Sequence, residues 1–178
     1  MANRTNTHAV HPITLLVLDV DGVLTDGSIT YDDQGRELKT FNARDGFGIK
    51  LWIRSGGTVA WLTGRGGGAV QRRAEELGVT ELIERATDKG EAMRNLLQRL
   101  GKTRADAAYI GDDWPDLAAM REVRYPIAVR DAAKPVLEAA RYMTLAVGGR
   151  GAVREAVEHL LTRQGMLESA LGQLAHQP

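Results

Sequence analysis

The chain has 178 residues, with 23 basic and 23 acidic residues and a formal net charge of zero. This length suits one domain with its own hydrophobic core, and the balanced charge argues against a nucleic-acid surface or a polybasic membrane patch. The sequence contains no cysteine, which excludes disulfides and thiolate metal sites and fits a cytoplasmic protein.

The two ends of the chain differ from its middle. Residues 1–12 are polar and lack the apolar segment of a secretory signal, so we expect a flexible N-terminal arm. Residues 13–164 are predicted to form the folded domain, and residues 165–178 a C-terminal tail that is partly helical or frayed. No apolar run is long enough to cross a bilayer.

Residues 13–18 are almost continuously apolar, which is typical of a parallel strand covered on both faces. Asp19 and Asp21 follow at the carboxyl end of that strand, where open α/β sheets bind ligands. Their side chains point the same way in an extended segment and can share one site. Adjacent carboxylates repel each other, and a magnesium ion is the simplest remedy. An ordinary acidic turn is the alternative.

Two short β-prone runs, residues 28–31 and 36–42, flank an Asp- and Gly-rich turn and predict a hairpin. Because an isolated hairpin is marginally stable, it must pack on its own domain or pair with copies of itself. A helix over residues 45–54 and a buried strand over residues 58–62 are predicted next. A second helix over 69–77 and a short strand over 80–84 follow.

Thr63, Gly64 and Arg65 stand between that buried strand and the next helix. A hydroxyl and free amides at such a position can cradle a phosphate, although a simple turn also explains them. The guanidinium of Arg65 suits a carboxylate or phosphate.

Farther on, Asp88 is a good N-cap for a helix ending near Leu100. A lysine in the first turn, Lys89, opposes the helix dipole unless it faces an anion; a solvated lysine is the alternative.

A fourth strand over residues 105–110 ends in Gly-Asp-Asp-Trp-Pro-Asp, residues 111–116. Three carboxylates therefore stand at another strand end. Asp113 could cap the helix predicted over 117–122, and Pro115 suits its first turn. The remaining predicted elements are a strand over 124–129, a helix over 134–141, an extended stretch over 142–146, a glycine-rich turn over 148–152 and a helix to residue 164.

Four segments of the chain resemble, in order, the four motifs of haloacid-dehalogenase-like phosphotransferases. They are the stretch with Asp19 and Asp21, residues 63–65, the helix start at Lys89, and residues 111–116. The stretch Asp-Val-Asp-Gly-Val-Leu-Thr-Asp-Gly, residues 19–27, is similar to the branch containing the 3-deoxy-D-manno-octulosonate 8-phosphate (KDO 8-phosphate) phosphatases. The resemblance implies an α/β, Rossmann-like three-layer domain with a mainly parallel central sheet. The first strand lies in the middle of that sheet, and a small β-hairpin stands in place of a cap domain.

The resemblance also implies roles for individual residues. Asp19 is expected to be the nucleophile and Asp21 the general acid/base. The expected Mg²⁺ ligands are Asp19, the backbone carbonyl of Asp21 and Asp112, and the expected substrate-binding residues are Thr63, Gly64, Arg65 and Lys89. Asp116 is expected to play an auxiliary part, while the roles of Asp113 and Arg150 are left open.

The implied activity is magnesium-dependent hydrolysis of KDO 8-phosphate to KDO and phosphate, through an aspartyl-phosphate, in lipopolysaccharide precursor synthesis. The branch also implies a homotetramer joined through the hairpin, with the glycine-rich turn and the C-terminal segment near a neighbour's site. Two alternatives stand beside this one. They are a phosphatase for another small sugar phosphate, and a non-catalytic oligomerising module related to the domain fused to sialic-acid cytidylyltransferases. The intact acidic set argues against the module.

Overall fold

The computed structural model describes residues 11–175, with side chains through residue 172. Its centre is a six-stranded parallel sheet with the order β5-β4-β1-β6-β7-β8. The strands are β1 (Leu15–Leu18), β4 (Thr58–Leu62), β5 (Glu81–Ile83), β6 (Ala107–Gly111), β7 (Tyr125–Ala128) and β8 (Tyr142–Met143). Because β1 lies between β4 and β6, this topology confirms the predicted Rossmann-like sheet with the first strand inside.

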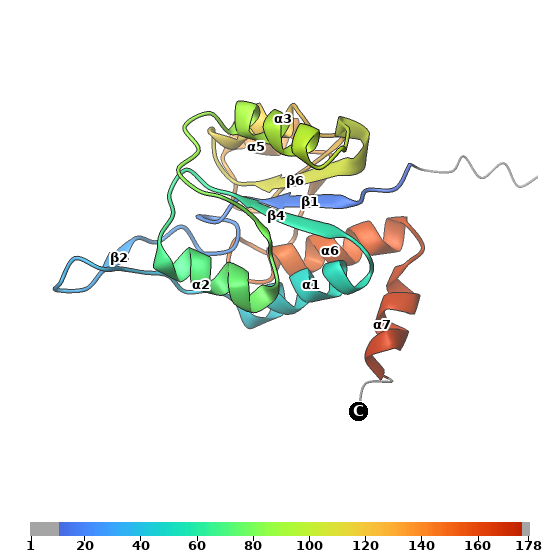
Figure 1. The fold of residues 1–178 in the computed structure, drawn as a ribbon, viewed down its shortest axis with the longest axis horizontal. Helices are drawn as coiled ribbons and strands as arrows, with labels where there is room; N and C mark the ends of the chain where they lie inside the picture. Colours follow the sequence, from blue (N-terminus) through green and yellow to red (C-terminus); the bar gives the residue numbers. More distant parts are fainter. Residues whose placement is uncertain (1–10, 176–178) are drawn as a thin grey trace, which may run out of the picture.

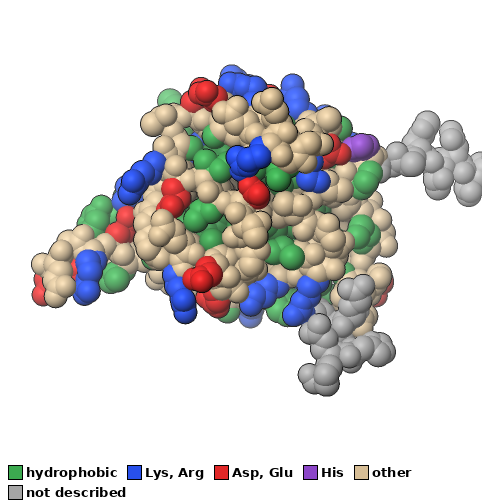
Figure 2. Space-filling view, in the orientation of Figure 1, with side chains coloured by type: hydrophobic (Ala, Val, Ile, Leu, Met, Phe, Trp, Pro, Cys, Tyr) green, Lys and Arg blue, Asp and Glu red, His purple; other side chains and the backbone are tan. Residues whose placement is uncertain are grey.

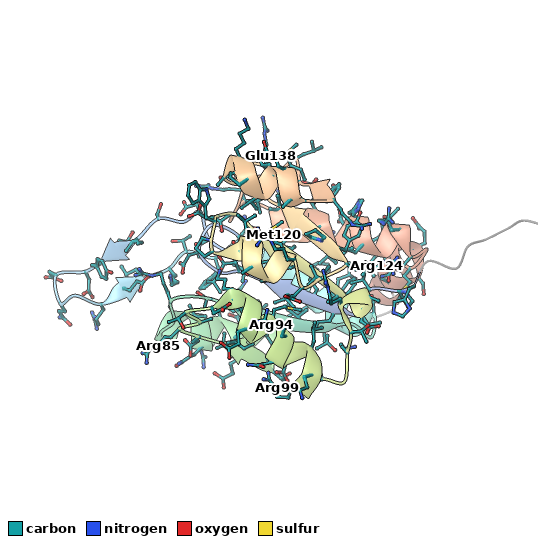
Figure 3. The ribbon with its side chains drawn as sticks, turned by 90° about the horizontal axis from the view of Figure 1, so that it is seen from above. Arg85, Arg94, Arg99, Met120, Arg124 and Glu138 are labelled. Carbon is teal, nitrogen blue, oxygen red and sulfur yellow. The ribbon has the colours of Figure 1, made fainter. Side chains whose placement is uncertain are left out.

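Helices cover both faces of the sheet, which gives three layers (Figure 1). One face carries α1 (Ala43–Arg54), α2 (Gly68–Leu77) and α6 (Ala152–Arg163). The other carries α3 (Lys89–Arg99), α4 (Asp116–Met120) and α5 (Lys134–Ala139), seen side by side in Figure 3 with Arg94, Met120 and Glu138 marking them. A short 3₁₀ turn, η1 (Arg104–Asp106), precedes β6. A last helix, α7 (Leu167–Ala175), follows α6, and its Ala170 is buried against the core.

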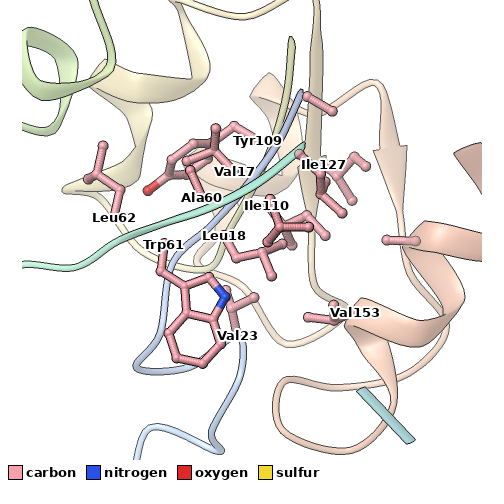
Figure 4. Close-up of a cluster of buried hydrophobic side chains, with 14 of the residues drawn as sticks. Val17, Leu18, Val23, Ala60, Trp61, Leu62, Tyr109, Ile110, Ile127 and Val153 are labelled. Carbon is pink, nitrogen blue, oxygen red and sulfur yellow. The ribbon is translucent and has the colours of Figure 1, made fainter. Parts of the chain in front are cut away.

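The hydrophobic core surrounds β1, whose four residues are all fully buried. Figure 4 shows Val17 and Leu18 beside side chains of β4 and β6, with Trp61 and Leu62 projecting to opposite sides of β4. Each large apolar side chain that is fully buried contributes roughly 1.5–3 kcal/mol of transfer free energy. The strand that leads into the first acidic motif is therefore fully enclosed by the core.

Side-chain caps define several helix ends. Asp88 accepts a hydrogen bond from the Glu91 amide at 2.9 Å, as predicted for the start of α3. The suggestion that Asp113 caps α4 was wrong. Pro115 occupies the N-cap position without a side-chain bond, and the backbone carbonyl of Asp113, rather than its carboxylate, accepts from the Asp116 amide at 2.9 Å.

The predicted hairpin is present as β2 (Thr30–Tyr31) and β3 (Glu37–Leu38), two antiparallel strands that project from the body of the domain (Figures 1 and 2). Asp32 closes its turn by accepting from the amides of Gln34 and Arg36 at 3.0 and 2.8 Å. Apolar side chains more than half exposed lie along it: Ile29, Tyr31 and Leu38. The hairpin thus offers apolar surface that its own domain does not cover.

The N-terminal arm was predicted over residues 1–12, and its first ten residues lie outside the described residues. Its eleventh residue is held against the domain: His11 Nε2 lies 2.8 Å from Asp106 Oδ1, and the His11 carbonyl accepts from Arg124 at 2.8 Å. Within residues 11–175, no helix has the length and apolar character needed to span a membrane.

Candidate active site

All the predicted site residues converge at the carboxyl ends of β1, β4 and β6. They line an open cavity of about 330 Å³. Its walls are Asp19, Asp21, Gly27, Thr63, Gly64, Arg65, Lys89, Asp112, Asp113, Pro115 and Asp116. Parallel strands bring the ends of segments distant in sequence to one edge of the sheet, so four separate motifs form one site.

The loop after β1 turns sharply so that its backbone approaches the fourth motif. Gly22 has φ of +91°, and a Cβ placed there would lie 2.0 Å from Asp112 Oδ2. Both conditions require glycine. The hydroxyl of Thr25 accepts from the amides of Gly22 and Gly27 at 3.3 and 3.2 Å and closes the turn. The loop is therefore built to bring the first motif against Asp112.

The glycine-rich turn supports this loop from within the same chain. A Cβ at Gly148 would lie 1.7 Å from the Gly22 carbonyl oxygen, and the Gly149 amide donates to the Val23 carbonyl at 2.9 Å. At its far end, the buried carboxylate of Asp45 accepts from the amides of Gly151 and Arg154 at 3.0 and 2.9 Å. The glycines thus serve close packing between this turn and the first motif.

Three carboxylates gather at the floor of the cavity. Oxygens of Asp19, Asp112 and Asp116 lie within 4.8 Å of one another. Burial, with the nearby Asp116 charge, raises the pKa of Asp19 to about 6 even though Lys89 opposes the shift. Burial, followed by the charges of Asp19 and Asp116, raises the pKa of Asp112 to about 8. The cluster is electrostatically unfavourable without a cation.

Lys89 is the cation already present in this cluster. Its ammonium lies 2.8 Å from Asp19 Oδ1 and 2.7 Å from Asp116 Oδ1, and its side chain is buried. Burial disfavours its charged form, but the two carboxylates outweigh that effect and raise its pKa. The alternative of a solvated lysine is therefore wrong, because the residue at the start of α3 points into the site.

The carboxylate of Asp116 accepts hydrogen bonds from several neighbours, which leaves few of its lone pairs available to bind a metal ion. Its Oδ1 accepts from Lys89 and from the Tyr109 hydroxyl, each at 2.7 Å. Its Oδ2 accepts from the amides of Asp112 and Asp113 at 2.9 and 3.2 Å. Four donors fix this carboxylate, so it holds the fourth motif in shape. The sequence pattern did not predict that Tyr109 supports the site, because an aromatic residue within a buried strand is expected to be part of the core.

Two buried carboxylate oxygens of the cavity lack a hydrogen-bond partner in the described part of the chain, and the one on Asp112 fits a hard divalent cation. Within residues 11–175, Asp112 Oδ1 and Asp21 Oδ2 are buried and lack a hydrogen-bond partner. Buried carboxylate oxygens are costly unless they are paired or bind a metal. Asp19 and Asp112 supply oxygen ligands of the kind that magnesium prefers. The donor set therefore fits Mg²⁺, with Asp116 better placed to support the site than to bind.

The second motif, residues 63–65, forms another part of the cavity wall. Thr63 is buried, and its hydroxyl accepts from the Arg65 amide at 3.1 Å. The guanidinium of Arg65, predicted to contact substrate, lies 3.2 Å from Glu37 Oε1 and donates to the Tyr31 hydroxyl at 3.3 Å. Arg65 thus joins the cavity wall to the hairpin.

Lys39 is a site residue that the sequence analysis missed. It follows β3 on the hairpin, and its ammonium donates to Asp21 Oδ1 and lies 2.9 Å from Glu37 Oε1. Its side chain is only 2% exposed. Burial disfavours its charge, yet its bonds to Asp21 and Glu37 raise its pKa. A lysine on a predicted surface hairpin is expected to be solvated, so the sequence pattern did not predict its contact with Asp21.

A parallel α/β sheet with acidic motifs after β1 and β6 and a lysine at the start of α3 is the arrangement of the haloacid dehalogenase-like hydrolases. The family model with that description matches residues 60–154. The 3-deoxy-D-manno-octulosonate 8-phosphate phosphatase KdsC of Escherichia coli K12 is 45% identical over 161 residues, which cover 90% of this chain and 86% of that protein. The Yersinia pestis KdsC protein is 46% identical over 160 residues, with the same coverage.

Solved structures agree with the sequence comparison. A Moraxella catarrhalis 3-deoxy-D-manno-octulosonate 8-phosphate phosphatase, in complex with magnesium, phosphate and KDO, has a TM-score of 0.89 at 40% identity, over 93% of this chain and 95% of that one. The cobalt-bound form of a deoxy-D-mannose-octulosonate 8-phosphate phosphatase from Haemophilus influenzae has a TM-score of 0.88 at 37% identity, over 93% of this chain and 99% of that one. The chain belongs to the 3-deoxy-D-manno-octulosonate 8-phosphate phosphatase family of haloacid dehalogenase-like hydrolases.

Proposed function

We propose that this protein is a magnesium-dependent phosphatase that hydrolyses KDO 8-phosphate to KDO and inorganic phosphate. The observation that carries the proposal is the acidic cavity at the ends of β1, β4 and β6, where Asp19 and Asp112 approach each other beside Lys89. Family membership supplies the substrate, because the relatives named above act on this sugar phosphate. In this role the enzyme belongs to lipopolysaccharide precursor synthesis in the cytoplasm.

Asp19, Asp112 and the backbone carbonyl of Asp21 would hold Mg²⁺. When bound, the ion supplies positive charge that offsets the carboxylates and the phosphoryl oxygens. The buried unpaired oxygen Asp112 Oδ1 supports this assignment. Asp116 holds Asp112 in place through its bond to the Asp112 amide at 2.9 Å.

Asp19 is the proposed nucleophile. One of its carboxylate oxygens attacks phosphorus as the bond from phosphorus to the sugar oxygen breaks, which gives an aspartyl-phosphate and the free sugar. Asp21 donates a proton to the departing sugar oxygen. It then takes a proton from the water that hydrolyses the intermediate, and inorganic phosphate leaves.

Thr63, Gly64 and Lys89 are proposed to bind the phosphoryl group. The buried Thr63 hydroxyl and the ammonium of Lys89 both line the cavity that contains Asp19. Because these donors are already fixed by neighbouring contacts, they stabilise charge on the transferring group without rearrangement. Arg65 remains a proposed contact for the anionic sugar.

The activity is tested by measuring phosphate release with Mg²⁺ from KDO 8-phosphate, other small sugar phosphates and a generic aryl phosphate. We expect the highest kcat/KM for KDO 8-phosphate. A higher kcat/KM for another sugar phosphate would favour the second enzyme hypothesis. No turnover of any phosphate would favour a non-catalytic module.

We also propose that the protein is a homotetramer joined through the hairpin. Ile29, Tyr31 and Leu38 support this proposal, because each is more than half exposed on a short projecting element that does not bury them itself. Such an assembly would let a neighbouring subunit form one wall of each open site.

Light scattering tests the assembly. Leu38→Asp should dissociate the tetramer, because it places a charge in the proposed apolar contact. Leu145→Asp is the matched control, since Leu145 is 77% exposed and belongs to the segment after β8 rather than to the hairpin. A wild-type monomer, or a Leu38→Asp tetramer, would contradict the proposal.

A further inference from the structure

The carboxylate of Asp21 is held at one oxygen and free at the other. Asp21 Oδ1 accepts a hydrogen bond from the ammonium of Lys39. Asp21 Oδ2 is buried and has no hydrogen-bond partner among the described residues. A carboxylate on a short side chain can rotate about its terminal torsion, so a bond at Oδ1 fixes the direction in which Oδ2 points.

Lys39 is itself fixed from the side of the hairpin. Its ammonium lies 2.9 Å from Glu37 Oε1, and that oxygen lies 3.2 Å from Arg65 Nη2. Arg65 in turn donates to the Tyr31 hydroxyl on the facing strand at 3.3 Å. With its side chain 2% exposed, Lys39 has no freedom to swing into solvent. The chain of contacts runs from the hairpin to the proposed general acid.

We propose that Lys39 is a positioning residue for the phosphatase reaction, orienting Asp21 so that Oδ2 faces the oxygen of the leaving sugar. The proposal rests on the proposed function, in which Asp21 transfers the proton. Lys39 keeps its own protons throughout: the proton that reaches the sugar oxygen comes from Asp21 as the bond between phosphorus and oxygen breaks. The hairpin thereby becomes part of the catalytic machinery within its own subunit.

The leaving group distinguishes this role from a purely structural one. A sugar alkoxide is a poor leaving group and needs the proton from Asp21, whereas para-nitrophenolate leaves readily without it. Since positioned general acids contribute about 10²–10⁴-fold, Lys39→Met should lower kcat/KM for the sugar phosphate by at least about 10²-fold. The value for para-nitrophenyl phosphate should fall by less than about 10-fold, because kcat/KM reports the step in which the leaving group departs. Lys39→Arg should recover part of the loss.

Arg36→Met is the matched control, because Arg36 lies on the same hairpin but pairs with Asp32 at the turn and does not reach the cavity. It should leave both kcat/KM values unchanged. Light scattering and thermal melting of each variant report assembly and folding. In an Asp21→Asn background, Lys39→Met should change the para-nitrophenyl phosphate rate by less than about twofold, since coupled residues are not additive.

Equal losses for the two substrates, or an undiminished effect of Lys39→Met in the Asp21→Asn background, would overturn the positioning role. A selective loss that Lys39→Arg partly restores would establish it. Failure of the proposed function gives a different result, because the wild-type enzyme itself would then not hydrolyse the sugar phosphate.

Discussion

The Tyr109 hydroxyl donates a 2.7 Å hydrogen bond to Asp116, and both side chains are almost completely buried. This bond links the middle of β6 to the start of α4 across the Gly-Asp-Asp turn. Asp116 in turn fixes the positions of Lys89 and Asp112, since it also accepts hydrogen bonds from the Lys89 ammonium and the Asp112 amide. The shape of the Gly-Asp-Asp turn, the proposed metal-binding turn, thus depends on a residue of the core.

Tyr109→Phe removes the hydroxyl and leaves the ring. We expect the free energy of unfolding to fall by about 1 kcal/mol, the usual net value of a buried hydrogen bond. We also expect a reduced kcat, because Asp116 loses one of its four donors. Urea unfolding and steady-state kinetics measure the two effects. Tyr125→Phe is the control: its hydroxyl bonds His159 at 2.8 Å, so it should lose stability without losing kcat. Equal kcat changes in the two variants would contradict the link.

Asp112→Ala removes a proposed direct ligand of the metal. It should raise the Mg²⁺ concentration needed for half-maximal activity by at least about 10-fold, because substitution of even the residues that support metal ligands lowers metal affinity or activity by about 10–100-fold. Asp113→Ala removes the neighbouring carboxylate, which is exposed, and should leave the requirement nearly unchanged. A magnesium titration of activity compares the two. A larger shift in Asp113→Ala would move the ligand role to Asp113.

Gly22→Ala tests the close approach of the first and fourth motifs. Gly22 has φ of +91° and leaves no room for a Cβ beside Asp112. Gly35→Ala is matched in backbone, with φ of +75°, but a Cβ there would meet nothing within 4 Å. Gly35→Ala should therefore show only the strain of about 1–2 kcal/mol. Gly22→Ala should lose more stability and also weaken magnesium binding, and calorimetry with and without Mg²⁺ measures both. Equal losses would show that the contact with Asp112 is unimportant.

Asp106 should make part of the stability acid-sensitive. Hydrogen bonds from Thr103, followed by that from His11, lower its pKa from 3.8 to about 2. A depressed pKa means that the stabilisation is fully present above pH 3.8 and is lost as the pH falls toward 2. The stability difference between wild type and Asp106→Asn should therefore shrink between about pH 5 and pH 3. Urea unfolding at both pH values measures it, and a constant difference would contradict the shift.

The sheet and its site were predictable because their signals are local. An apolar strand that ends in Asp19 and Asp21, or a capped helix that begins at Lys89, can be read from adjacent residues. Contacts between distant segments were not predictable. Lys39 reaches Asp21 across 18 positions, and Asp45 binds the start of α6 across more than 100. The role of Asp113 was misjudged because its backbone carbonyl, rather than its carboxylate, accepts from the Asp116 amide, and Pro115 has no amide proton to donate to a cap.

Turnover of KDO 8-phosphate by Asp19→Asn with Mg²⁺ shows most directly whether Asp19 is the nucleophile. The substitution keeps the shape of the side chain and removes the nucleophilic oxygen that would form the aspartyl-phosphate. We expect the variant to fold as stably as the wild type, or more stably because carboxylate repulsion is relieved, and to release no phosphate above the uncatalysed background. Phosphate release by Asp19→Asn near the wild-type rate would contradict this expectation and remove Asp19 from the reaction.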